Sequence, residues 1–425
     1  MSAKKITPLR GMHDLFGHEI ETYNKIIDTA KLVTQSYGYQ IIQTPILENS
    51  EIFLRTLGET SDIIGKETYT FSDREKRSLT MRPEFTAAMV RAFISNGWTQ
   101  SLPQKLFSYG PLFRHERPQK NRYRQFHQFN CEFFGAKTYH SDVEMISMAH
   151  SILAKLRIAD HVSLQLNTLG DEKTREDHRR ALVEYLEKHQ NNLSLLSRER
   201  MMRNPLRVLD SKEECDQEVV KNSPNILDYL TPEAAQYHNN ILKSLEKLQI
   251  PFKVNSKIVR GLDYYTSTIF EYTSDITNQM AVMAGGRYDN LVANMGGGNV
   301  RAIGLGAGIE RLIYIMHSLE EQKAKSRAGI YLVSMDDSCA SMLMQLAYNL
   351  RYGGILTYLD YLDNGTQIKK AVEKADKIAA RYLLVLGLDE LNSGQYIVKD
   401  MNNGQGKKGK IKEIENDLKT LYNLS

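Results

Sequence analysis

Hydrophobic and polar residues alternate most regularly between Phe126 and Phe134, and this alternation predicts a β-strand. Successive side chains of a strand point to opposite faces, so the alternation separates two sets of residues. One face carries His127, Phe129, Cys131 and Phe133, and the other carries Gln128, Asn130, Glu132 and Phe134. The second face is unusual, because the amide of Gln128 and the carboxylate of Glu132 would stand side by side on it.

A second strand, from Gln104 to near Arg114, precedes this one, and a polar loop from Glu116 to Arg124 joins the two. The basic residues of the loop are Arg117, Lys120, Arg122 and Arg124. An amide and a carboxylate beneath an arginine-rich loop suit a small zwitterionic ligand together with a polyphosphate. A solvated hairpin with an ordinary basic turn explains the same residues, so the pattern alone leaves both interpretations open.

The pattern on either side of the hairpin predicts a domain that mixes strands and helices. Residues 17–36 have apolar positions at helical spacing, and Pro83 is well placed to open a helix that runs to about Asn96. Glu84 and Thr86 fall in the first turn of that helix, where Glu84 could bind a ligand or simply complement the helix dipole. The other elements expected here are a strand at 39–44, a loop-rich stretch at 51–70, a strand at 78–81, a helix at 141–156 and a strand at 162–169.

The stretch from about 171 to 248 is dense in charged and amide residues with helical periodicity, which predicts a helical module inserted into the strand-rich domain. Strands resume at 252 and again at 260–274. Residues 279–292 predict a strand, a turn at Gly285-Gly286 and a helix carrying Arg287, Tyr288 and Asp289. Residues 296–316 predict a glycine-rich strand that leads into a helix with Arg311 in its first turn.

A charged linker at 320–327 is followed by strands and helices in alternation. Strands at 329–335, 355–358 and 382–386 and helices at 339–352 and 367–377 predict a βαβαβ unit. A strand at 395–399, a Gly/Lys turn at 402–410 and a last helix near 413–422 complete it. We therefore expect a separate α/β domain of about 100 residues at this end of the chain.

Composition sets limits without indicating a function. The chain has 425 residues, enough for two or three domains, and its formal charge of +4 permits a nucleic-acid partner. Its three cysteines are isolated, so neither a disulfide framework nor a structural metal site is expected, and the reducing cytoplasm is the expected compartment. The sequence contains no secretory signal and no apolar run long enough to span a bilayer, so we expect a soluble protein with no membrane partner.

Common nucleotide-binding and hydrolase signatures are missing from the sequence. There is no GxxxxGK[ST], GxSxG or HExxH, and the glycines between Gly304 and Gly308 lack the GxGxxG spacing of a dinucleotide site. Several arginines lie instead at predicted strand ends or helix starts, namely Arg82, Arg114, Arg122, Arg260 and Arg311. Guanidinium groups bind phosphate or carboxylate in a bidentate manner, so arginines at so many junctions favour a polyphosphate site.

Six segments resemble the signature motifs of class II aminoacyl-tRNA synthetases, and of the histidyl-tRNA synthetase family in particular. GYQIIQTPILE, FRHERPQKNRYRQFHQFNCEFFG and GLGAGIERL resemble the first, second and third class motifs. RGLDYYT and AGGRYDNLV resemble two motifs particular to the histidyl family, and TMRPEFTAAMVRA resembles its amino-acid loop. The resemblance covers essentially the whole chain, and the class I signatures are missing.

The resemblance implies an α+β catalytic domain, in which helices flank an antiparallel sheet, with a helical insertion and a C-terminal α/β anticodon-binding domain. We expect the catalytic domain at 1–325, its insertion at about 171–248, and the anticodon-binding domain at 328–425. The implied activity is a ligase that activates L-histidine with ATP and Mg²⁺, releases pyrophosphate, and transfers the histidyl group to the terminal adenosine of tRNA(His). The first motif implies a homodimer.

The resemblance also implies a role for each matching residue. Arg114 and Arg260 would be the catalytic residues, on either side of the α-phosphate. ATP would be bound by Arg114, Glu116, Arg122 and Arg311. Histidine would be bound by Glu84, Thr86, Gln128, Glu132, Tyr265 and Tyr288, of which Glu132 and Tyr265 would read the imidazole nitrogens. Gln119 would approach the tRNA acceptor end, and no residue is assigned to a metal.

Two positions depart from the family's pattern, since Phe85 and Asn290 stand where RPEGTA and GGRYDGL have glycine. Neither change removes a polar contact. The alternative function is a non-catalytic, histidine-sensing paralogue that acts as a regulatory subunit. Such paralogues typically lack the anticodon-binding domain and arginines like Arg114 or Arg260, which this chain retains. A synthetase for another amino acid of the subclass is disfavoured by Glu132 and by the RGLDYY run.

Overall fold

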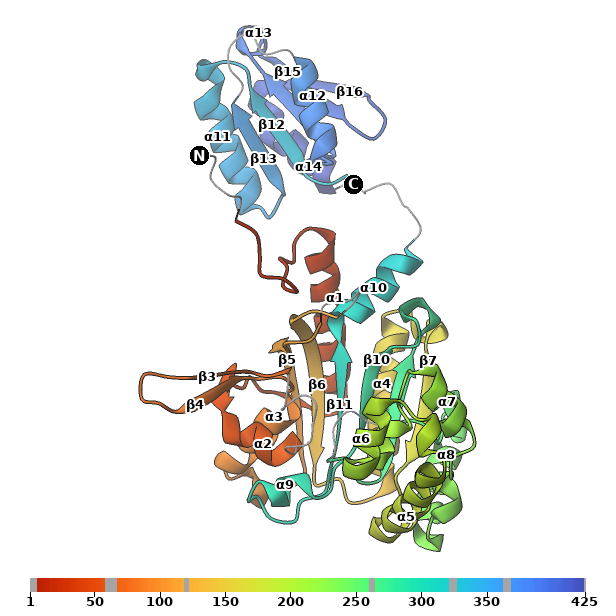
Figure 1. Cartoon of the computed structure of the whole chain (residues 1–425). Helices are drawn as coiled ribbons and strands as arrows, with labels where there is room; N and C mark the ends of the chain where they lie inside the picture. The colour runs from red at the N-terminus through yellow and green to blue at the C-terminus, as the bar shows by residue number, and fades with distance from the viewer. Residues whose placement is uncertain are drawn as a thin grey trace, which may run out of the picture. The chain divides into compact units, whose positions relative to one another are not determined.

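The computed structural model describes residues 6–57, 67–117, 122–259, 264–320, 327–361 and 368–423. They fall into two compact units that divide between Leu319 and Glu320, each with its own sheet (Figure 1). No helix in these ranges is both long and apolar enough to cross a membrane.

The described part of the first unit is built on an eight-stranded sheet with the order β1-β5-β6-β11-β10-β9-β7-β8. The strands, in that order, are Gln40–Ile41, Gln104–Phe113, Gln125–Phe134, Ala302–Gly308, Ala281–Arg287, Thr268–Thr273, Ser163–Thr168 and Phe252–Val254. Neighbours from β5 to β7 pair antiparallel, whereas the two edge strands, β1 and β8, pair parallel. The sheet is therefore antiparallel through its centre and mixed as a whole, which agrees with the expected α+β catalytic fold.

Helices on one face of this sheet form the main hydrophobic core. The helices are α1 (His18–Ser36), α4 (Tyr139–Lys155), α8 (Pro232–Lys247) and α10 (Ile309–Leu319). Ile26, Ile146, Ile241 and Ile313 of these helices lie in one buried cluster with Phe129 of β6. Residues 17–36 were expected to be helical because apolar side chains recur there at helical spacing, and burial of that stripe explains the spacing.

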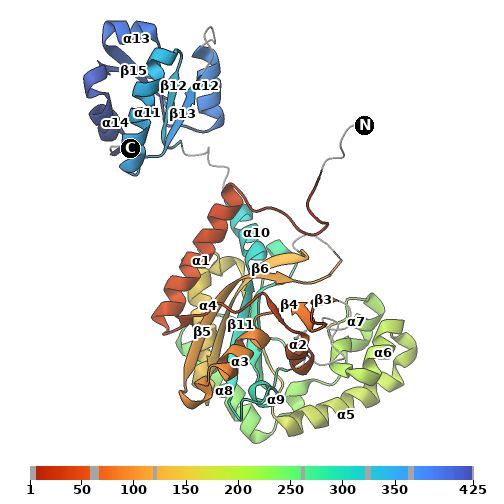
Figure 2. The same cartoon turned by 90° about the vertical axis from the view of Figure 1, so that its left-hand side faces the viewer.

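The opposite face of the sheet carries a smaller layer (Figure 2). It contains α2 (Ser50–Leu57), α3 (Thr86–Ser95), α9 (Leu291–Asn294) and a three-stranded sheet of β2 (Leu47–Asn49), β3 (Tyr69–Ser72) and β4 (Ser78–Met81). Phe53, Phe85 and Phe93 of this layer pack with Leu106 and Phe134 of the large sheet. The alternation in β6 therefore divides its residues between two buried layers, and its polar face is enclosed.

The helical stretch after β7 contributes to two different cores. Helices α5 (Glu172–Lys188), α6 (Leu195–Arg203) and α7 (Glu214–Lys221) form a cluster of their own around Leu182, Leu186, Leu193, Met201, Val208, Val219 and Val220. In contrast, Ile241 and Leu245 of α8 belong to the main core, where α8 packs on α4. The inserted module with an independent core therefore ends before α8.

The second unit has a five-stranded sheet with the order β13-β12-β14-β15-β16 over its described residues. Its strands, in chain order from β12 to β16, are Ile330–Ser334, Thr357–Tyr361, Tyr382–Leu386, Gln395–Asp400 and Gly406–Lys410. Its helices are α11 (Asp337–Tyr352), α12 (Ile368–Lys377), α13 (Leu388–Ser393) and α14 (Ile414–Asn423). β12 pairs parallel with both β13 and β14, which confirms the predicted βαβαβ unit.

Several local expectations were wrong. The predicted turn at 402–410 contains strand β16, which pairs with β15. Helix α3 begins at Thr86, three residues after Pro83. Gly285 and Gly286 lie inside β10, where they pair with strands on both sides. A Cβ atom on Gly285 would lie 2.2 Å from the carbonyl oxygen of Gly304, so close strand packing explains glycine there.

Candidate active site

The polar face of β6 faces a row of glycines on its neighbour. Asn130 and Glu132 pair directly with Gly306 and Gly304 of β11, and Gly304 pairs in turn with Gly286 of β10. Directly paired residues project from the same face of a sheet. A Cβ atom on Gly304 would lie 1.8 Å from Oε2 of Glu132, so only glycine fits beneath that carboxylate. We call Gly286, Gly304 and Gly306 the glycine floor, because they let polar groups and a ligand approach the backbone closely.

Glu132 is fully buried and held by two hydroxyl groups above this floor. Thr86 donates a hydrogen bond from Oγ1 to Oε1 of Glu132 over 2.7 Å, and the hydroxyl of Tyr288 donates to Oε2. Burial raises the pKa of Glu132 to about 8, although hydrogen bonds from Tyr288, Thr86 and Asn130 oppose the rise. When this buried carboxyl group ionises, a further N–H donor would offset the free-energy cost of burying its charge.

Glu84 is joined to the same network through the backbone of α3. Its carboxylate accepts hydrogen bonds from the backbone N–H groups of Thr86, over 2.7 Å, and Ala87, over 2.6 Å. Glu84 therefore complements the start of helix α3, which is one of the two roles that the sequence suggested for it. Burial raises its pKa, while the backbone N–H groups and the charge of Arg114 oppose the rise. Each carboxylate oxygen can accept more than one hydrogen bond, so this capping role leaves capacity for a ligand.

Three tyrosines enclose the side of the site next to β10. The ring centroids of Tyr264 and Tyr265 lie 4.8 Å apart, and those of Tyr264 and Tyr288 lie 5.6 Å apart. Tyr265 overlies the glycine floor, since a Cβ atom on Gly286 would lie 2.8 Å from its Cδ1. The sequence analysis did not assign Tyr264 a role, although it neighbours Tyr265 in the RGLDYY run.

Three arginines gather at the other end of the site. The pKa of Arg311 is lowered by burial and by the positive charges of Arg122 and Arg114, which indicates that the three guanidinium groups share one region. Glu116 lies 3.8 Å from Nη1 of Arg114 and 3.5 Å from Nη1 of Arg122. Arg114 is fixed by a 2.9 Å hydrogen bond from Nε to the carbonyl oxygen of Pro83. Two carboxylates, those of Glu116 and Glu310, act on Arg311 beside the other two guanidinium groups, so the region keeps a positive excess that suits an anion.

Arg82 does not belong to that group, contrary to the sequence-based grouping. It is only 2% exposed, and it donates to the carbonyl oxygens of Pro111, over 3.0 Å, and Thr44, over 2.8 Å. Its guanidinium carbon also lies 4.3 Å from the ring centroid of Phe85. Arg82 therefore fastens three backbone segments together, and Phe85 supplies a stacking surface for it.

The predicted residues Arg260 and Gln119 lie outside the described residues. The structure adds a buried ion pair that the sequence analysis missed, between Arg287 and Asp142. Arg287 also donates to the carbonyl oxygen of Ala136 over 2.6 Å. Nothing in the local sequence signals this pair, because its members are separated by 145 positions. It fixes the end of β10 next to Tyr288, and so supports the network around Glu132.

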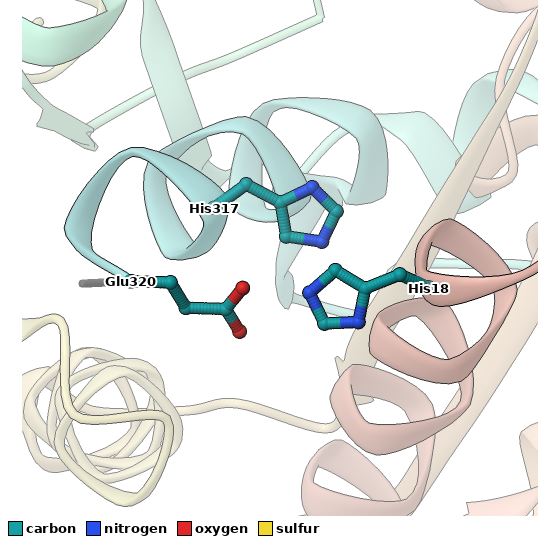
Figure 3. A group of neighbouring side chains, drawn as sticks. All are labelled: His18, His317 and Glu320. Carbon is teal, nitrogen blue, oxygen red and sulfur yellow. The ribbon is translucent and has the colours of Figure 1, made fainter. Parts of the chain in front are cut away.

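Among the described residues, one group of three could hold a metal ion: His18, His317 and Glu320 (Figure 3). The possible ligand atoms lie within 4.8 Å of one another. The rings of His18 and His317 stack with centroids 4.4 Å apart, and Nε2 of His317 lies 2.9 Å from Oγ1 of Thr22. Two of the three residues are exposed, and none of them was predicted as a site residue.

The fold and the site together define a class of protein. A sheet that is antiparallel through its centre and is flanked by helices is the fold expected of a class II aminoacyl-tRNA synthetase, and here it carries a buried carboxyl network next to clustered arginines. Family comparison agrees, since residues 11–312 match the model of histidyl-tRNA synthetase and residues 328–421 match that of an anticodon binding domain. The chain belongs to the histidyl-tRNA synthetase family.

Individual relatives resemble the chain over nearly its full length. It is 43% identical to a histidine–tRNA ligase of Wolbachia pipientis strain wPip over 410 residues, which are 96% of this chain and 98% of the relative. It is 44% identical to one of Gluconobacter oxydans, over 93% of this chain and 94% of the relative. The solved structure of the apo histidyl-tRNA synthetase of S. aureus matches with a TM-score of 0.78 and 29% identity, over 98% of this chain and all of the other.

A solved structure whose description names two roles also shares the fold. A Bacillus halodurans structure described as an ATP phosphoribosyltransferase regulatory subunit/histidyl-tRNA synthetase matches with a TM-score of 0.64, over 88% of this chain and 97% of the other. Its identity to this chain is only 20%, so the likeness is one of fold.

Proposed function

We propose that this chain is a histidine–tRNA ligase whose amino-acid site is the Glu132 network and whose ATP site is the arginine group. The observation that carries the proposal is a fully buried carboxyl group, held by Thr86 and Tyr288, beside a positively charged region in a member of the histidyl-tRNA synthetase family. Such a site suits a ligand with an N–H donor at one end and a phosphate partner at the other.

Recognition of histidine would depend on hydrogen bonds between its nitrogen atoms and the polar groups of the site. Glu132 and Tyr265 would contact the imidazole nitrogens, and Glu84, Thr86 and Gln128 would contact the α-amino group. An apolar side chain of similar size would leave Glu132 buried without its N–H donor, and sites of this type discriminate by about 10⁴-fold or more. The pocket therefore selects histidine during binding and needs no separate editing step.

Activation requires placement and fixed positive charge. The histidine carboxylate attacks the α-phosphorus of ATP, the bond to the β-phosphate oxygen breaks, and pyrophosphate leaves. Arg114 and Arg260 would stabilise the charge that grows on the α-phosphate, while Glu116, Arg122 and Arg311 would hold the rest of ATP, which enters as its Mg²⁺ complex. A ribose hydroxyl of the terminal adenosine of tRNA(His) then attacks the carbonyl carbon, and AMP leaves. Gln119 would lie near that acceptor end.

The rest of the chain supports the same function. The match of residues 328–421 to an anticodon binding domain supports a tRNA-reading role for the second unit. We propose a catalytic domain at 1–325 and an anticodon-binding domain at 328–425, in a homodimeric, cytoplasmic protein. The insertion is proposed at about 171–248, where only the part before α8 has a core of its own and α8 itself packs into the catalytic core.

The test is pyrophosphate exchange with ATP and each of the twenty amino acids. We expect exchange with histidine alone. Arg311→Gln should reduce the rate by about 10²-fold or raise the KM for ATP, because one preorganised positive donor is lost. Arg301→Gln is the matched control, since Arg301 is an exposed arginine at the other end of β11. Histidine binding without exchange for any amino acid would favour the regulatory paralogue, and exchange with another amino acid would contradict the proposed specificity.

A further inference from the structure

Asn130 is a buried polar residue in the site to which the proposed mechanism gives no role. It lies on β6 between Gln128 and Glu132, on the same face as both, and it is only 5% exposed. Its carbonyl oxygen, Oδ1, has no hydrogen-bond partner among the described residues. A buried amide oxygen without a donor is unfavourable, and such groups commonly mark a place that a ligand or water completes.

The side-chain amide of Asn130 lies near both Glu132 and the glycine floor. The interaction of its side chain with Glu132 lowers the pKa of that carboxyl and so opposes the effect of burial. The amide stands beside Gly306, where an added Cβ atom would lie 3.1 Å from Nδ2 and 3.2 Å from Oδ1 of Asn130, and 3.4 Å from Oε1 of Gln128. The carbonyl oxygens of both amides therefore reach the space above the same glycine of the floor.

Two neighbouring carbonyl oxygens are acceptors, so they fit a group that carries several N–H donors. Histidine offers such a group in its α-ammonium, which has three N–H donors and a positive charge. The imidazole would contact Glu132, which lies two residues further along β6 on the same face. The ionisable residues near Asn130 and Glu132 include Glu84, Tyr264, Tyr265 and Tyr288. The position of Asn130 next to Gln128 thus favours the ammonium end of the ligand.

We propose that Asn130 is a further substrate-binding residue, whose carbonyl oxygen accepts a hydrogen bond from the α-ammonium group of histidine beside Gln128. The inference rests on the proposed function, because it takes histidine as the ligand of this site. Asn130 would then connect both ends of the substrate, since its side chain also favours the ionised form of the carboxyl that meets the imidazole.

The experiment compares Asn130→Ala with the matched control Ser108→Ala. Ser108 is the residue directly opposite Asn130 on β5, is fully buried, and also has a side-chain oxygen without a partner among the described residues. Wild type and both variants are assayed for the KM of histidine and of ATP by pyrophosphate exchange. The inhibition constant of imidazolepropionate, which keeps the imidazole and lacks the α-amino group, is measured in the same assay. Thermal unfolding establishes that each variant is folded.

We expect Asn130→Ala to raise the KM for histidine by about tenfold or more, as is typical when a hydrogen bond to a charged group is lost. The KM for ATP should stay near the wild-type value. The inhibition constant of imidazolepropionate should rise by a factor at least five times smaller than the factor by which the KM for histidine rises. Ser108→Ala should change none of these values. The proposal would be overturned if the KM for histidine and the inhibition constant of imidazolepropionate rose by the same factor, or if neither rose. Absence of histidine-dependent exchange in the wild type would instead refute the proposed function, so the two failures are distinguishable.

Discussion

The buried carboxyl of Glu132 makes the stability of the first unit depend on pH in a direction that can be measured. Glu132 is 0% exposed, and its pKa in the folded chain is about 8, compared with 4.5 for an ordinary glutamate. Because the folded pKa is the higher one, folding binds a proton between these two values. Its stabilising contribution is therefore fully present below about pH 4.5 and is lost as the pH rises through about 8.

Glu132→Gln removes this titration while keeping the shape of the side chain. A pKa difference changes stability by about 1.4 kcal/mol per pH unit within the window, so the wild type should lose about 3 kcal/mol between about pH 5.5 and pH 7.5 relative to the variant. The assay is urea unfolding followed by fluorescence of Trp98, the chain's single tryptophan, which packs against the buried layer around α3. This probe reports the first unit alone.

A control variant separates the effect of Glu132 from a general change of charge. Glu187 lies exposed on α5, in the helical module, and Glu187→Gln should show the same pH dependence as the wild type. If the unfolding midpoints of Glu132→Gln and the wild type move in parallel between the two pH values, then Glu132 does not take up a proton on folding. The account of its burial would then be wrong.

Three other results are expected. Histidine binding should release up to one proton near pH 7, because an imidazole N–H donor favours the ionised form of Glu132, whose pKa is about 8 without a ligand. Calorimetry in buffers of different ionisation enthalpy measures this release, and its absence would argue against Glu132 as the acceptor. Gly304→Ala should abolish detectable histidine binding, since its Cβ atom would lie 1.8 Å from Oε2 of Glu132, whereas Gly308→Ala, whose nearest contact would be 3.7 Å away, should still bind. Asp142→Ala should lower the free energy of unfolding by about 3 kcal/mol, because it removes the fully buried carboxylate that pairs with Arg287 and leaves only the partly exposed Asp289, and a loss below about 1 kcal/mol in urea unfolding would contradict this.

Much of the local structure could be predicted because it depends on short-range patterns. The alternation over 126–134 predicted β6 to within a residue, and the periodicity over 17–36 predicted α1. The predictions failed where distant contacts override local preference. Gly285-Gly286 has the composition of a turn, yet it lies inside β10, since strands β9 and β11 approach too closely for larger side chains.

The candidate site shows the same division. The sequence placed Gln128 and Glu132 on one face of a strand, and the family resemblance pointed to Thr86 and Tyr288. Only the fold brings Thr86 and Tyr288 to the two oxygens of Glu132, across 46 and 156 positions of the chain. The fold also directs the guanidinium group of Arg82 to backbone carbonyl oxygens, although the local sequence did not distinguish Arg82 from the other arginines at strand ends.

By itself, the sequence determined which segments form strands and helices, which residues share a face, and which family the chain resembles. The tertiary structure decided which of those faces are buried, that glycines lie beneath Glu132, and that Asn130 has an unpartnered oxygen in the described site. The physical reason is that side-chain alternation depends on neighbouring residues alone, whereas burial, pKa and hydrogen-bond partners depend on the register of strands that are remote in sequence, such as β6 and β11.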